Sequence, residues 1–180
     1  RYPLIVDPAF LRNYCIWIHV NFFGIGDVDS LPSPQELRCF VYSKIRESLE
    51  SSRPELVPKN GEDIRDLFSS HVDRIKNTIL FGIPEDSPEW NLKLGEIIYD
   101  LQNSDDEYVA ALLEKLRNTG LRIVIVLDNS DQQGEDFQER VFLLAQKLAL
   151  DHKALCIVSL REERFFSAFR PRAFSRTSIK

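Results

Sequence analysis

The stretch that decides the fold is LRIVIVLDNSD, residues 121–131. Its apolar run, residues 123–127, is rich in β-branched side chains, follows Gly120 and ends abruptly on Asp128. Such a run is typical of a strand buried on both faces, as in a parallel sheet covered by helices. An acid at the carboxyl end of such a strand occupies the position where open α/β sheets bind ligands. Asp128 and Asp131 also suit the simpler role of ending the strand and capping a helix, and this stretch alone favours that role.

A second apolar run, residues 154–160, follows an intervening amphipathic helix and ends on Arg161. Strand, crossover helix and strand form a right-handed βαβ unit, so both carboxyl ends face the same edge of the sheet. We therefore expect Asp128 and Arg161 to meet over one ligand. An acid that can hold a metal beside a cation that can contact phosphate is the combination that nucleotide hydrolysis requires.

These two segments resemble a known family. The segment IVIVLDNSDQ, residues 123–132, resembles the Walker B strand of P-loop NTPases, and its D-N-x-D ending is similar to that of STAND-type and KAP-type NTPases. The segment CIVSLRE, residues 156–162, resembles the next strand of those families, which ends in the sensor arginine. The resemblance covers the C-terminal part of the chain. It implies a three-layer α/β fold with a mostly parallel sheet, and ATP and Mg²⁺ as cofactors.

The resemblance also implies roles for particular residues. Asp128 would hold Mg²⁺, Asn129 or Asp131 would orient or polarise the attacking water, and Arg161 would sense the γ-phosphate. Asn129 departs from the acid that many ATPases carry at that position. Because an amide cannot act as a base, we expect either slow hydrolysis or that Asp131 takes the role.

The phosphate-binding loop of this family is missing from the sequence. A P-loop needs G-x-x-x-x-G-K-[ST], and the chain contains no Gly-Lys pair. The glycines of residues 24–27 lack both a third glycine and a nearby lysine, so they predict a turn. The chain begins at Arg1 and contains no methionine. We therefore expect a fragment of a longer protein whose P-loop lies upstream, with residues 14–23 forming the strand after the P-loop helix.

The middle of the chain, residues 34–118, predicts a large helical insertion inside a single domain, residues 1–180. Apolar residues at helical spacing and capping residues define its helices. These predicted helices span residues 34–51, about 62–80, 88–102 and 105–118. A further amphipathic helix is predicted over residues 137–150, between the two C-terminal strands.

Composition limits the classes of partner. The chain has 43% hydrophobic residues and a formal net charge of -5, which suits a folded domain without a global attraction to nucleic acid or anionic membranes. The C-terminal end is locally basic. We expect Arg170 and Arg172 to lie at an interface or at the edge of the nucleotide, with nucleic acid as the minority alternative.

Three scattered cysteines predict buried thiols in a reducing compartment, and without a membrane span or signal peptide we expect a cytoplasmic protein.

Three hypotheses about function follow. The leading one is the ATPase core of a STAND-like switch for signalling or defence, able to form homo-oligomers, with hydrolysis in the full-length parent and an inactive isolated fragment. The second is a degenerate NTPase-like module that binds proteins without catalysis. The third makes Asp128 the nucleophile of a phosphotransferase. It is disfavoured because haloacid-dehalogenase-type enzymes have D-x-D at a strand end, and this chain has D-N-S-D.

His19, within the first predicted strand, is expected to be structural rather than catalytic.

Overall fold

The sheet forms the centre of the fold. The computed structural model describes residues 14–23, 25, 31–85 and 87–160. Three strands, β1 (Cys15–Asn21), β2 (Arg122–Asp128) and β3 (Leu155–Val158), form a parallel sheet in the order β1-β2-β3. The decisive apolar run is therefore the central strand, and the predicted α/β class with a parallel sheet is confirmed.

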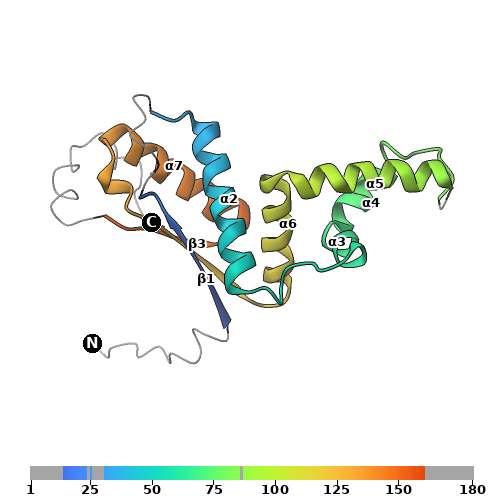
Figure 1. Cartoon of the computed structure of the whole chain (residues 1–180), viewed down its shortest axis with the longest axis horizontal. Helices are drawn as coiled ribbons and strands as arrows, with labels where there is room; N and C mark the ends of the chain where they lie inside the picture. Colours follow the sequence, from blue (N-terminus) through green and yellow to red (C-terminus); the bar gives the residue numbers. More distant parts are fainter. Residues whose placement is uncertain (1–13, 24, 26–30, 86, 161–180) are drawn as a thin grey trace.

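Helices cover one face of this sheet. Ile18 of β1 and Ile125 of β2 are paired in register, and both point into the main core. Three helices pack over that face: α2 (Pro34–Ser52), α6 (Asp105–Asn118) and α7 (Glu135–His152) (Figure 1). Among the residues that the structure describes, no helix covers the opposite face. The described part thus has two layers, and the predicted third layer is not seen there.

Local signals in the sequence set the starts of these helices. Ser33 and Glu36 form a capping box at the start of α2, with Pro34 as its first residue. Ser104 caps α6, whose first turn carries three acidic residues facing the positive end of the helix. The two helices are then fastened together, because Arg46 Nη1 of α2 donates to Asp105 Oδ1 at 2.9 Å.

The predicted helical insertion does not form one layer. Its first and last helices, α2 and α6, belong to the layer on the sheet. The middle helices α3 (Gly61–Leu67), α4 (Ser69–Lys76) and α5 (Pro88–Asn103) form an arm that extends away from the sheet (Figure 1). The arm has its own apolar cluster, which consists of Val72, Ile75, Leu80, Trp90 and Leu94.

The prediction of one helix over residues 62–80 is wrong. Two short helices replace it, and they meet at Phe68, which is fully buried in the main core. Phe68 packs edge-on against the ring of His71, with 5.9 Å between ring centroids. Burial of this aromatic side chain overrides the helical periodicity that predicted a continuous helix. After Lys76 the chain turns, and Gly82 there adopts a positive φ of 85°.

The other predicted elements are confirmed with small shifts in their ends. Helix α7 begins at Glu135 and runs to His152, so it is longer at both ends than predicted. The polar segment before it contains a short 3-10 helix, η1 (Ser130–Gln132). All three cysteines are free thiols, but Cys39 is exposed, contrary to the expectation that all three are buried. No helix in the described part of the chain is long and apolar enough to cross a membrane.

Candidate functional site

The candidate site lies where β1 and β2 end. Asn21 and Asp128 are the last residues of these two strands and are partners in the parallel register. Asn129 follows in the left-handed conformation, with φ 61° and ψ 22°, and turns the chain into η1. Asparagine tolerates this conformation better than most residues with a side chain. The strand end and the turn therefore bring several polar side chains to the carboxyl edge of the sheet.

Hydrogen bonds hold these side chains in place. Asn129 Nδ2 donates to Asn21 Oδ1 at 2.9 Å, and the backbone N–H of Asn129 donates to Asp128 Oδ1, also at 2.9 Å. The other carboxylate oxygen, Asp128 Oδ2, lies 3.4 Å from His19 Nε2. The Asp128 side chain is 32% exposed. One carboxylate is thus fixed at the edge and still reachable from solvent.

Ser130 and Asp131 lie deeper than Asp128. Ser130 is fully buried and Asp131 is only 4% exposed. Asp131 is one of the two residues, with Asn129, that were predicted to orient or polarise the attacking water, and this burial keeps its carboxylate away from bulk solvent. Of the predicted site residues that the structure describes, Asp128 and Asn129 are therefore the two that a ligand can reach directly from solvent.

The predicted arginines lie outside the described residues. These are Arg161, Arg170 and Arg172. Strand β3 does run beside β2 toward the same edge, because the Ser159 N–H donates to the Leu127 carbonyl at 2.9 Å. The expected geometry in which both strand ends face one edge is confirmed up to Leu160.

Two residues of the edge were missed by sequence reasoning. Asn21 was treated only as part of a strand, and His19 was expected to be packed or hydrogen-bonded for structural reasons. In the structure the His19 side chain is 56% exposed and lies beside Asp128. A signal did exist, because His19 and Asn21 alternate with the buried Ile18 and Val20, which indicates that the two polar residues share the opposite face.

The residues of the edge can hold a cation only in part. The described residues contain no group of three or more His, Cys, Asp and Glu side chains placed to bind a metal ion. Mg²⁺ is commonly bound by one or two carboxylates, with water and substrate phosphates filling the other positions. The accessible carboxylate of Asp128 fits such a partial site and does not fit an all-protein cage.

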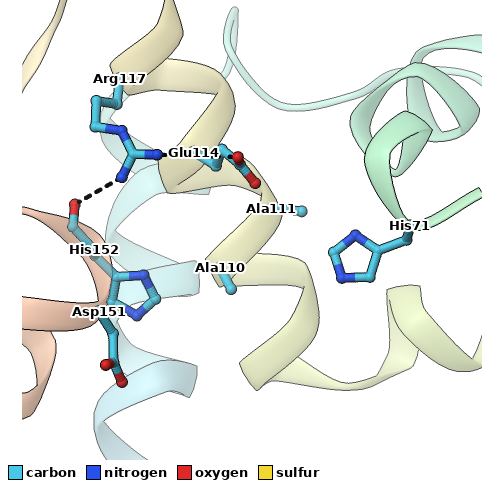
Figure 2. A pocket seen from close by; sticks show the side chains of 7 residues that line it. All are labelled: His71, Ala110, Ala111, Glu114, Arg117, Asp151 and His152. Atoms are coloured by element: carbon cyan, nitrogen blue, oxygen red, sulfur yellow. Dashed lines mark hydrogen bonds and ion pairs between the residues drawn. The ribbon is translucent and has the colours of Figure 1, made fainter. Parts of the chain in front are cut away.

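A separate hollow lies toward the opposite, amino-terminal edge of the sheet. It has a volume of about 210 Å³ and lies between α4, α6 and the end of α7 (Figure 2). Its polar lining includes His71, Glu114, Arg117, Asp151 and His152. Arg117 is already engaged, since its Nη1 donates to the His152 carbonyl at 3.5 Å. The sequence analysis predicted no function for these residues.

A buried polar pair lies beside this hollow. The hydroxyl of Tyr42 on α2 lies 2.7 Å from Nε2 of His152 on α7. Burial lowers the pKa of His152 from its ordinary value and raises the pKa of Tyr42. Both shifts favour the neutral forms, so the hydrogen bond joins a neutral Tyr42 hydroxyl to a neutral His152 ring, and the tautomer of the ring sets its direction. The pair links two helices of the layer and needs no ligand to be satisfied.

Comparisons with known proteins add no further assignment. No protein-family model matches the chain, and neither the curated proteins nor the solved structures contain a match.

Proposed function

We propose that this chain is the ATPase core of a STAND-like nucleotide-dependent switch, and that the carboxyl edge of its sheet binds a magnesium nucleotide. The observation that carries the proposal is the position of Asp128. Its carboxylate is fixed and accessible at the end of the central strand, beside the amide groups of Asn21 and Asn129. Ligands of open parallel sheets bind outside the carboxyl ends of the strands.

In this proposal each residue has a defined task. Asp128 holds Mg²⁺, and Asn129 orients the attacking water through its amide. Asp131 supports the same turn from its buried position and acts on the water only after a local rearrangement. The arginine at the end of β3, Arg161, contacts the γ-phosphate, with Arg170 and Arg172 nearer the rim. When bound, Mg²⁺ supplies charge neutralisation of the phosphates.

The chain itself lacks one part that the proposal requires. A loop that wraps phosphate with backbone N–H groups and a lysine has no counterpart, because the sequence holds no Gly-Lys pair. The proposal therefore assigns this loop, and with it hydrolysis, to a longer parent protein. A cytoplasmic location and nucleotide-dependent self-association belong to the same proposal.

The test is calorimetric titration of the full-length parent with Mg-ATP. We expect binding that weakens by at least about tenfold in Asp128→Asn, because this isosteric change removes the charge that the cation needs. Arg161→Ala should weaken ATP binding more than ADP binding, since its assigned contact is with the γ-phosphate. A turnover assay with the same variants then separates an enzyme from a binding switch.

A matched control distinguishes the site from general charge effects. Asp73→Asn removes an exposed acid on helix α4 and should leave nucleotide binding unchanged. If the folded parent does not bind Mg-ATP, or if the variants at Asp128 and Asp73 behave alike, the ATPase proposal is wrong.

A specific observation favours a second candidate, a protein-interaction module without catalysis. The arm of helices α3 to α5 and the turn between them carry large exposed apolar side chains, and Phe81 is 82% exposed. The others on the arm are Ile79, Leu92 and Tyr99. These four side chains lie on one arm, and exposed apolar side chains can form a protein contact.

This second candidate predicts self-association through the arm. Sedimentation velocity over a range of concentrations should show association that Phe81→Ser and Leu92→Ser weaken. Leu150→Ser, which removes an equally exposed leucine from α7, is the control and should have no effect. A chain that stays monomeric at all concentrations removes self-association as the function of the arm.

A further inference from the structure

One face of the sheet is open in the described structure. Parallel sheets are usually covered on both faces. Here the strand residues that point away from the helices include Trp17 of β1, which is 49% exposed, and Leu155 and Ile157 of β3, at 60% and 39%. Val124 of β2, which is 5% exposed, lies between Trp17 and Leu155 in the register and completes an apolar row across all three strands. Val126 lies between His19 and Ile157. We call these five apolar residues the open face.

We propose that the open face is the docking surface for the chain's own C-terminal segment, residues 161–174. The inference is independent of the proposed nucleotide binding. Strand β3 forms one border of the open face, and the described chain stops at Leu160, two residues after β3 ends. The segment therefore starts beside the surface that it would cover, so little chain is needed to reach it.

The sequence of the segment fits this surface. Phe165, Phe166 and Phe169 have the spacing i, i+1 and i+4, which would gather three aromatic rings on one side of a helix. Pro171 would end such a helix. The residues before it, 161–170, would span about 15 Å as a helix. Three strands are about 10 Å across, at about 4.8 Å between neighbours, so the length is sufficient to cross the sheet.

Charge supports the segment over an unrelated apolar partner. Asp128 lies at the carboxyl edge on the same side of the sheet as Trp17, because both alternate with residues that face the helices. Arg161 follows directly in sequence on Leu160, the last described residue after β3, and Arg164 comes three positions later. Docking would bring cations toward the exposed carboxylate of Asp128 and aromatic rings toward the apolar row.

Tryptophan fluorescence can test the proposal because the two tryptophans lie in different environments. Trp17 belongs to the open face, whereas Trp90 is buried in the cluster of the arm. Acrylamide quenching of the 180-residue chain therefore reports mainly on Trp17, and Trp90→Phe makes it the only tryptophan. We expect a blue-shifted, weakly quenched Trp17. In Phe165→Ser/Phe169→Ser its emission should shift to the red and its quenching constant should rise by about twofold or more, as apolar cover is lost.

Controls separate docking from other causes. Phe81→Ser removes a phenylalanine that is already exposed and should leave the fluorescence of Trp17 unchanged. Phe165→Ser/Phe169→Ser should also be measured in the chain that keeps Trp90, so that the result does not depend on the folding of Trp90→Phe. Protection of Trp17 that is independent of protein concentration supports docking within one chain.

Three results would overturn the inference. Trp17 that is readily quenched in the intact chain shows that the segment does not cover it. Protection that appears only as concentration rises assigns the open face to a second copy. An equal effect of Phe81→Ser shows that the probe reports general loosening of the fold.

Discussion

The hydrogen bond between Tyr42 and His152 gives a sharp test of how the helical layer is held together. The change is Tyr42→Phe, which removes one hydroxyl and keeps the ring. That hydroxyl lies 2.7 Å from His152 Nε2, and both residues are buried. Removing it leaves the ring nitrogen of a buried histidine without its hydrogen-bond partner.

The magnitude follows from the cost of leaving a buried polar atom without its hydrogen-bond partner. We expect the free energy of unfolding to fall by about 1–2 kcal/mol near pH 8. For a chain of this size that lowers Tm by about 2–8 °C. The value should exceed the effect of an exposed tyrosine hydroxyl, because that group exchanges its hydrogen bond for water.

The same pair predicts a dependence on pH. Burial lowers the folded-state pKa of His152 below its ordinary value of 6.5, so the unfolded chain takes up a proton first as pH falls. The stability that neutral His152 contributes is present above pH 6.5 and is lost as pH falls through the folded-state pKa. In the tautomer whose Nε2 accepts from the Tyr42 hydroxyl, protonation of the ring removes this bond from the wild type, and Tyr42→Phe lacks it at every pH. The difference from wild type should therefore be largest at pH 8 and become smaller as the solution is acidified.

Urea unfolding at several pH values, followed by circular dichroism, measures both effects. Tyr99→Phe on helix α5 is the matched control, because Tyr99 is 67% exposed and should lose little stability. If Tyr42→Phe is as stable as Tyr99→Phe at pH 8, the pair does not hold α2 to α7. A difference that grows on acidification would show that Nε2 donates to the Tyr42 oxygen, a bond that protonation of the ring strengthens.

Three further changes test the fold in the same urea assay. Ile125→Val in the fully buried centre of β2 should cost about 1 kcal/mol, whereas Ile79→Val on the surface of the arm should change stability by less than about 0.5 kcal/mol. Lys153→Gly should stabilise the chain by up to about 1 kcal/mol, because Lys153 ends α7 with a φ of 51° that glycine adopts without strain. Ser33→Ala should cost about 1 kcal/mol, because it removes the side chain that caps α2 and accepts from the Glu36 N–H.

The parts of the fold that depend on local signals could be predicted from the sequence. The run at residues 123–127 has the composition of a buried central strand, and Ser33 and Ser104 have the spacing of helix caps. The break at Phe68 could not be predicted, because its cause is a tertiary contact. The periodicity of residues 62–80 favours one helix, but burying the Phe68 ring in the main core is worth more than the continuity of the helix.

The candidate site was predictable only where a local signal in the sequence indicates it. An acid after a buried strand indicates the carboxyl edge, so Asp128 could be predicted as a site residue from its sequence neighbours alone. His19 and Asn21 lie more than a hundred positions earlier in the sequence. Their approach to Asp128 and Asn129 depends on the register between β1 and β2, which no local pattern specifies. Register decides which distant residues share an edge, and it becomes visible only in the folded sheet.

The conformation of Asn129 gives a reason to regard this edge as more than the end of a strand. A residue with a side chain pays about 1 kcal/mol for a left-handed backbone, and glycine would avoid that cost. Asn129 uses the conformation to place its amide against Asn21 Oδ1, at a partly exposed position where packing gains little. The amide of Asn21 in turn accepts from the Phe23 N–H at 2.8 Å, so both amides are held in defined orientations next to the Asp128 carboxylate. The turn therefore holds polar groups in fixed orientations at an accessible edge, which is what the proposed nucleotide site requires.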